Sequence, residues 1–76
     1  MTAFEMKERL REMNSHILFD YKGQPCGVDP LSVKHYDMWY GDKTAEAGSL
    51  DEVMTTKLFD GRSLNEIVGQ VENVEL

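Results

Sequence analysis

The sequence predicts an α+β fold: an N-terminal helix, an antiparallel meander of three or four strands, and two C-terminal helices packed on one sheet face. Capping boxes, in which a Ser or Thr and a Glu three residues later satisfy each other's free N–H groups, occur three times. Between the first two boxes, apolar side chains alternate with polar ones, as in a half-buried strand. The chain of 76 residues has room for one small domain, residues 1–76.

The capping boxes place three helix starts. The capping pairs are Thr2 with Glu5, Ser49 with Glu52, and Ser63 with Glu66. Apolar residues recur at spacings of three and four after each box, which predicts helices over residues 3–14, 50–59 and 64–73. The apolar stripe of the first helix consists of Ala3, Met6, Leu10 and Met13. We expect the second helix to end at Asp60-Gly61, because Gly adopts the left-handed cap conformation.

The first half of the meander is predicted to be a hairpin. Ile17, Phe19 and Tyr21 alternate with Leu18, Asp20 and Lys22, which predicts a half-buried strand, and a turn follows at residues 23–25. A short return strand is expected over residues 26–29. Asp29-Pro30 should end its hydrogen-bond ladder, because Pro has no N–H to donate.

The second half of the meander is predicted from aromatic content and from a turn. Residues 35–40 include three aromatic side chains of the kind enriched in sheets, which predicts a strand. Gly41-Asp42 is a two-residue hairpin turn of the primed type. It places a further strand at residues 43–47, although Ala and Glu are poor strand formers.

The alternation assigns side chains to the two faces of the sheet. The residues expected to face the helices are Ile17, Phe19, Tyr21, Tyr36, Met38 and Tyr40. The residues expected to face outward are Leu18, Asp20, Lys22, His35, Asp37 and Trp39. A register shifted by one residue is the alternative, and it would bury Trp39 and expose the other aromatic set.

The outward set supplies the candidate site for binding a partner. Trp39 is the single tryptophan of the chain, and tryptophan is enriched among the residues that dominate binding energy at protein interfaces. With Trp39 as the anchor, the predicted partner-binding residues are Leu18, Asp20, His35, Asp37 and Trp39. The expected occupant is a protein partner or a second copy of this chain.

The sequence contains no complete pattern for a catalytic, metal-binding or phosphate-binding site. Cys26 lies in a turn and pairs in principle with His16 or His35 as a base, but nothing in the sequence brings them together. A metal site would combine His35 and Asp37, two apart on one strand face, with His16 or Cys26 from the neighbouring hairpin, and it requires at least one more ligand than this local spacing provides. No glycine pattern typical of a phosphate-binding loop occurs. We therefore expect no enzyme activity, no cofactor and no metal.

Charge gives the alternative function. Fourteen acidic residues against eight basic ones leave a net charge of −6, which argues against direct nucleic acid binding. Most of the negative excess lies in residues 39–76, where local capping explains part of it. The alternative function is therefore an acidic inhibitor or nucleic-acid-mimicking decoy, which would occupy a basic surface of a target protein through its C-terminal helices.

The two ends of the chain give the remaining expectations. The first residues mix Lys, Arg and Glu where a signal peptide is apolar, and no apolar run reaches the length of a membrane span. We expect a cytoplasmic protein with no membrane contact. At the other end, Val71, Val74 and Leu76 are expected to dock on the core as a final turn or short strand; capture by another protein's groove or sheet edge is the alternative.

Overall fold

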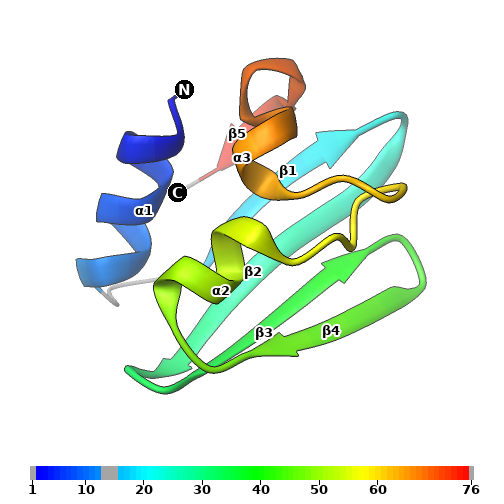
Figure 1. Cartoon of the computed structure of the whole chain (residues 1–76). Coiled ribbons are helices and arrows are strands. Elements are labelled where there is room, and N and C mark those ends of the chain that lie inside the picture. The colour runs from blue at the N-terminus through cyan, green and yellow to red at the C-terminus, as the bar shows by residue number, and fades with distance from the viewer. Residues whose placement is uncertain (1, 13–15, 76) are drawn as a thin grey trace.

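The computed structural model describes residues 2–12 and 16–75, and their arrangement confirms the predicted α+β class (Figure 1). The helical elements are α1 (Ala3–Glu12), α2 (Leu50–Thr55), α3 (Leu64–Ile67) and the 3-10 helix η1 (Val68–Gln70). The strands are β1 (Ile17–Tyr21), β2 (Gln24–Ser32), β3 (His35–Tyr40), β4 (Lys43–Ala47) and β5 (Glu72–Glu75).

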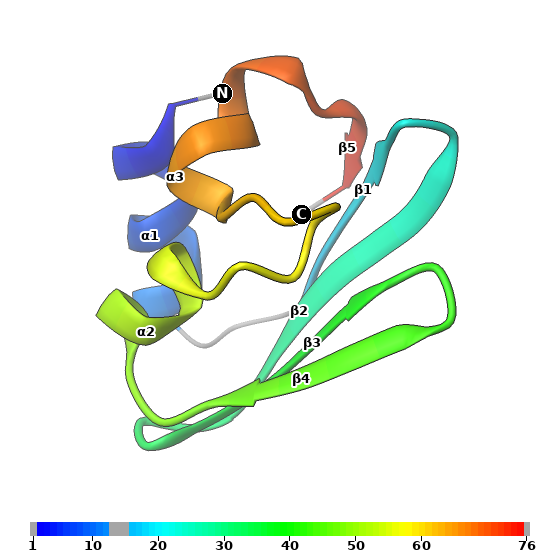
Figure 2. The same cartoon turned by 45° about the vertical axis from the view of Figure 1, so that its right-hand side comes forward.

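The strands form one antiparallel sheet in the order β4-β3-β2-β1-β5. The first four strands are the predicted meander, and the C-terminal β5 joins it beside β1. All three α-helices lie on one side of this sheet (Figures 1 and 2). None of the described elements covers the other side, which is called the outer face below.

The predicted register is correct. Ile17 lies opposite Val28, and Val28 lies opposite Met38, so these three side chains share the face beneath the helices. Ile17, Phe19, Tyr21, Tyr36 and Met38 are buried, and the predicted inward Tyr40 packs partly buried against them. The shifted register, which would have buried Trp39, is not found.

The helix layer closes this core through a few apolar side chains. Met6 and Leu10 of α1 are fully buried, and Ala3 packs against the same cluster, as the apolar stripe predicted. The fourth stripe residue, Met13, and the predicted helix end at Asn14 lie outside the described residues. From α2, α3 and the segment between them come Val53, Met54, Phe59, Leu64 and Ile67.

All three predicted helix starts are confirmed by their caps. The Glu5 amide donates to Thr2 Oγ1 at 3.1 Å, and the Thr2 amide donates to Glu5 Oε1 at 3.0 Å. The Glu52 amide donates to the hydroxyl of Ser49, at 3.1 Å. At α3 the Ser63 amide donates to a carboxylate oxygen of Glu66, at 3.0 Å.

The first hairpin differs in detail from the prediction. Its turn is Lys22-Gly23, with φ values of 52° and 76°, and Tyr21 pairs directly with Gln24. Lys22, predicted to be an outward strand residue, is therefore a turn residue. A two-residue turn with positive φ at both positions matches the twist of the flanking strands, so it is favoured over the predicted three-residue turn at residues 23–25.

The prediction that Pro30 ends the second strand is wrong. β2 runs on to Ser32, and Pro30 lies opposite Tyr36. Pairing between β1 and β2 reaches only to Val28, so at Pro30 the strand has a neighbour on one side only. A proline is tolerated at such a position, because no ladder there needs its missing N–H. The register then shifts between Pro30 and Ser32.

The second helix is shorter than the predicted span of residues 50–59. The hydroxyls of Thr55 and Thr56 donate to backbone carbonyls one turn earlier, at 2.9 and 2.6 Å, and such threonines favour a helix end. The chain then extends and delivers Phe59 to the sheet, where its ring centre lies 5.9 Å from that of Phe19. Burial of this ring outweighs continuation of the helix.

The predicted helix cap at Asp60-Gly61 is also wrong. These two residues have φ values of 58° and 78° and form a tight turn that bridges Phe59 to Arg62. Aspartate, here Asp60, is one of the few residue types that tolerate a positive φ. The turn reverses the chain beneath the sheet and leads into α3.

The third helix is shorter than predicted, and a strand replaces its second half. The predicted helix over residues 64–73 ends at Ile67 and is followed by η1 and β5. In β5, Glu75 lies opposite Leu18 of β1. β5 covers backbone groups that β1 would otherwise leave unpaired at the sheet edge. The expected docking of the C-terminus as a short strand is confirmed for residues 72–75, and Leu76 lies outside the described residues.

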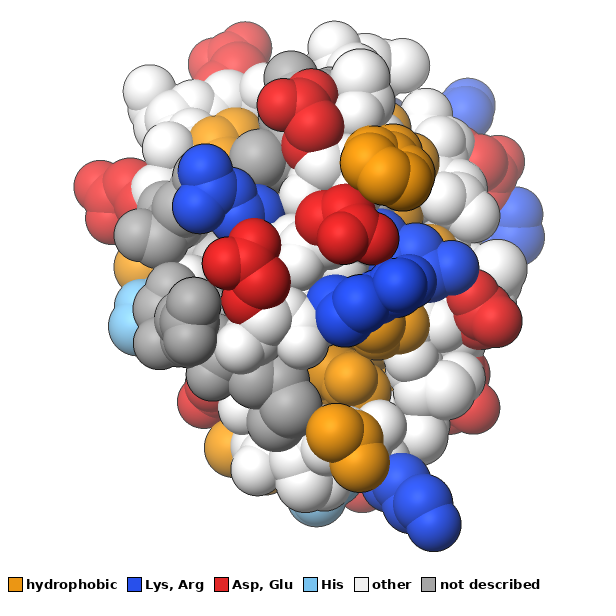
Figure 3. Space-filling view, turned by 90° about the vertical axis from the view of Figure 1, so that its left-hand side faces the viewer, with side chains coloured by type: hydrophobic (Ala, Val, Ile, Leu, Met, Phe, Trp, Pro, Cys, Tyr) orange, Lys and Arg blue, Asp and Glu red, His pale blue; other side chains and the backbone are white. Residues whose placement is uncertain are grey.

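The side of the molecule that carries α1 is a mixed ionic surface, on which acidic and basic side chains alternate (Figure 3). Lys7 pairs with Asp51 at 2.6 Å, and Arg11 lies 3.6 Å from Glu8. Interleaved charges of opposite sign cancel much of one another's field, and salt screens the remainder over a Debye length of about 10 Å. No helix among the described residues is long and apolar enough to cross a membrane.

Candidate functional site

A row of side chains centred on Trp39 crosses the outer face. Leu18 lies opposite Gly27, Gly27 opposite Trp39, and Trp39 opposite Thr44. The indole is half-buried because it lies over Gly27. An ideal Cβ at Gly27 would stand 2.2 Å from Trp39 Cζ2. The indole of Trp39 therefore occupies the space that a side chain at Gly27 would fill.

Shallow hollows open on either side of the indole. One is lined by Trp39 together with Asp37, Thr44 and Glu46. The other is lined by Trp39 together with Leu18 and Asp20. Trp39 thus forms a ridge between two depressions, and its exposed edge is available to a molecule that docks on this face.

Carboxylates lie beside the Trp39 row. Asp29, Asp37 and Glu46 are direct neighbours on β2, β3 and β4, and these three residues are called the acidic row. Like charges directly opposite each other on neighbouring strands are destabilising. Farther along, Asp20 accepts a 2.8 Å hydrogen bond from the Asn73 side-chain amide. None of the described strand residues on the outer face is Lys or Arg.

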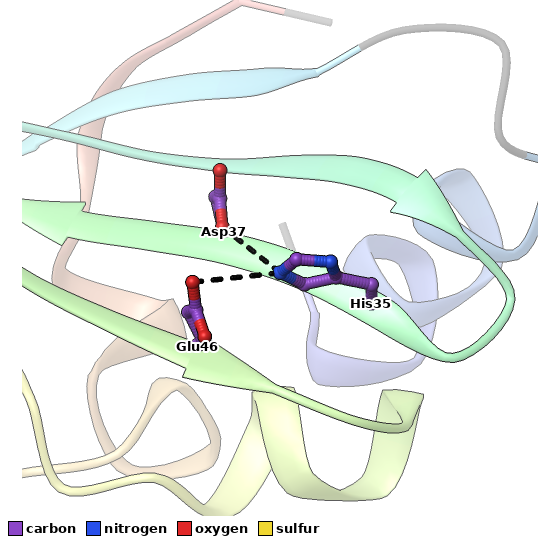
Figure 4. A group of neighbouring side chains, drawn as sticks. All are labelled: His35, Asp37 and Glu46. Carbon is purple, nitrogen blue, oxygen red and sulfur yellow. Dashed lines mark ion pairs between the residues drawn. The ribbon is translucent and has the colours of Figure 1, made fainter.

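His35 turns its ring toward the acidic row (Figure 4). Its Nε2 lies 3.4 Å from Asp37 Oδ1 and 3.6 Å from Glu46 Oε1. The three residues offer ligand atoms that all lie within 4.8 Å of one another. The side chains of His35 and Asp37 are about half exposed, at 47% and 46%, so solvent reaches the space between them.

The structure brings the predicted partner-binding residues onto one face. Leu18, Asp20, His35, Asp37 and Trp39 all lie on the outer face of the described sheet.

Three further residues of this face were missed by sequence reasoning. They are Gly27, Asp29 and Glu46. The signal for Glu46 was present, since counting outward from the predicted Gly41-Asp42 turn places it opposite Asp37, as observed. No comparable signal existed for Asp29, because the register shift in β2 displaces the pairing by one residue.

Among the described hydrogen bonds, the candidate nucleophile Cys26 has none with either candidate base, and His16 is exposed just before β1. Its side chain belongs to the buried core beneath the helices, whereas His35 lies on the outer face. Burial raises the pKa of the Cys26 thiol to about 11, which disfavours the reactive thiolate. Its Sγ lies 3.4 Å from the carbonyl oxygen of Gln24. Cys26 behaves as a small core residue.

Three carboxylates of the C-terminal half outside the sheet have lysine partners. Lys7 pairs with Asp51, Lys22 pairs with Asp60 at 2.8 Å, and Lys57 pairs with Glu66. In each case the hydrogen bond from the lysine is the largest of the effects that lower the carboxyl pKa. These three pairs reduce the charge that a decoy surface on the C-terminal helices would present.

Comparison of the chain with protein-family models, with curated proteins and with solved structures found no match. The outer face combines a half-buried tryptophan, carboxylates on neighbouring strands, and a histidine directed at two of them.

Proposed function

We propose that this protein is a non-catalytic cytoplasmic interaction module that binds a basic surface of a partner protein through the outer face. The observation that carries the proposal is the position of Trp39 beside the acidic row on an uncovered sheet. A large aromatic anchor near the centre of a patch, with polar and charged residues on its rim, is typical of a specific interface.

The charge of the outer face selects the chemistry of the partner. Its described strand residues include several carboxylates and neither Lys nor Arg. A surface rich in Lys and Arg would complement the acidic row and would be steered toward it during association. Phosphate backbones would be repelled, so direct nucleic acid binding is not proposed.

A basic partner is favoured over self-association and over the C-terminal helices as the binding surface. In a two-fold dimer built on this face, each copy would present its acidic row to the same interface. The C-terminal carboxylates Asp51, Asp60 and Glu66 already pair with lysines of the chain itself. The acidic row has no such lysine partner among the described ion pairs.

The test compares wild-type protein with variants matched on opposite sides of the molecule. Tagged wild type, Trp39→Ala, Asp37→Asn and the control Phe4→Ala are used to capture proteins from lysate of the native host at two salt concentrations. Phe4 is 72% exposed on α1, away from the outer face. Each captured protein is then identified, purified and measured directly for binding.

The proposal requires a captured protein with a basic surface that binds wild type and Phe4→Ala equally. Trp39→Ala should weaken its binding at least tenfold, as truncation of an interface anchor does. Asp37→Asn should weaken it less and reduce its salt dependence. A partner that ignores Trp39 but is released by salt would shift the site to the C-terminal helices. Concentration-dependent dimerisation abolished by Trp39→Ala would show self-association instead.

A further inference from the structure

We propose that His35, Asp37 and Glu46 form a binding site for a divalent transition-metal ion on the outer face. The three side chains come from the start of β3 and the end of β4, and their ligand atoms converge (Figure 4). The site shares Asp37 and Glu46 with the acidic row, but it uses no atom of Trp39.

The spacing of the ligand atoms fits a small metal ion. Around a tetrahedral zinc ion with bonds of about 2.0–2.2 Å, neighbouring ligand atoms lie roughly 3.4 Å apart. The Nε2 atom of His35 lies 3.4 Å from Asp37 Oδ1 and 3.6 Å from Glu46 Oε1. Two edges of the required ligand triangle therefore already have the right length. The third edge, between the carboxylates, is no longer than 4.8 Å.

The backbone holds these ligands in place. Asp37 and Glu46 lie directly opposite each other on hydrogen-bonded strands, and His35 lies two residues before Asp37 on the same face. Ligands on paired strands lose little backbone freedom when a metal binds, in contrast to ligands on a flexible loop. The sheet thus supplies the pre-organisation that the sequence spacing of His35 and Asp37 alone did not.

Electrostatics favours a cation at this position. The paired carboxylates Asp37 and Glu46 repel each other, and Asp29 lies on the other side of Asp37. Among the described ion pairs, Asp37 and Glu46 have His35 as their partner. A divalent ion would offset this repulsion, because it places two positive charges between the carboxylates.

The donor types identify the class of metal. A neutral imidazole gives a ring-nitrogen lone pair to zinc and similar first-row ions, whereas magnesium and calcium prefer oxygen donors alone. Three protein ligands with about half of the His35 and Asp37 side chains exposed leave further positions for water or for a ligand atom of another molecule.

The test measures Zn²⁺ binding to the full chain by isothermal titration calorimetry, with Mg²⁺ as the comparison ion. The variants are His35→Gln and Glu46→Gln, and the matched control is His16→Gln, which alters the other histidine, an exposed residue just before β1. Amide chemical shifts map the position of the ion. Circular dichroism checks that each variant retains its fold.

The proposal requires one saturable Zn²⁺ site. His35→Gln and Glu46→Gln should each weaken it at least tenfold, and His16→Gln should change it less than twofold. Mg²⁺ should bind at least a hundredfold more weakly, with zinc-induced shifts confined to the adjoining parts of β3 and β4. The proposal is overturned if Zn²⁺ fails to saturate, binds equally to His35→Gln or Glu46→Gln, binds no better than Mg²⁺, or shifts residues around Cys26.

A Trp39→Ala variant separates this proposal from the proposed function. Trp39 contributes no ligand atom to the cluster, so its loss should leave the affinity for Zn²⁺ within twofold while it weakens partner binding at least tenfold. Loss of Zn²⁺ binding in Trp39→Ala would overturn the assigned ligand set. Weaker partner binding with an unchanged affinity for Zn²⁺ is the expected result, because Trp39 belongs to the partner surface and not to the ligand set.

Discussion

Glycine and tryptophan depend on each other at the centre of the outer face. Gly27 is buried although it has no side chain, because the indole of Trp39 covers it. Glycine within a strand normally weakens the sheet, and a covering aromatic ring on the neighbouring strand compensates for this. Gly27 weakens β2 locally, and the same glycine allows Trp39, the proposed anchor, to lie over the strand.

Gly27→Ala should destabilise the protein by about 1–3 kcal/mol, because the added methyl group forces the ring from its seat. Urea unfolding gives the free energy, and the emission maximum of Trp39 should move to longer wavelength as the indole becomes more exposed. The control is Gly69→Ala, where no heavy atom lies within 4 Å of the added Cβ. An unchanged stability and emission maximum in Gly27→Ala would contradict this packing.

The helices are short, and their stability depends strongly on the hydrogen bonds and charges at their ends. The α3 helix has four residues, fewer than an isolated helix needs for stability in water. Its capping box is reinforced by Lys57, which pairs with Glu66. The hydrogen bonds from Lys57 and Ser63 lower the Glu66 pKa to about 2. The start of α3 is therefore linked to the ionisation of one carboxylate.

Protonation of Glu66 should destabilise the protein in acid. Its pKa lies near 4.5 when unperturbed and near 2 in the fold, so its contribution is present above pH 4.5 and is lost as the pH falls toward 2. In Glu66→Gln the free energy of unfolding should depend less steeply on pH across that window. Urea unfolding at several pH values measures this. Glu72→Gln, which alters an exposed residue of β5, should keep the wild-type slope.

The whole molecule is a sheet with one covered face and one uncovered face. Burial of side chains from α1, α2 and α3 supplies the core on the covered side. A chain of 76 residues buries a small fraction of its surface compared with larger domains, so each core side chain matters. The uncovered side contributes little to that core, which leaves its residues free for recognition.

Leu10→Ala should destabilise the fold by about 2–5 kcal/mol, because it removes a fully buried side chain from the contact of α1 with the core. Phe4→Ala on the same helix should change stability by less than about 0.5 kcal/mol, since Phe4 is exposed. Chemical denaturation of both variants measures the difference. Equal effects would contradict the docking of α1 through its Met6 and Leu10 face.

The sequence by itself determined the features that depend on neighbouring residues. The three helix starts follow from capping pairs three residues apart. The Gly41-Asp42 turn and the strands on either side of it follow from two-residue turn chemistry. Alternation correctly separated Tyr36 and Met38 from Asp37 and Trp39, because side chains of a strand point to opposite faces in turn.

Only the tertiary structure decided where elements end and which distant residues meet. Phe59 ends α2 early because its ring gains more from burial against Phe19 than from another helical turn. β5 replaces the second half of a helix because β1 offers an edge that lies far away in sequence. The position of Asp29 opposite Asp37 depends on a shift within β2. Long-range pairing and burial set these features, and local propensity is too weak to oppose them.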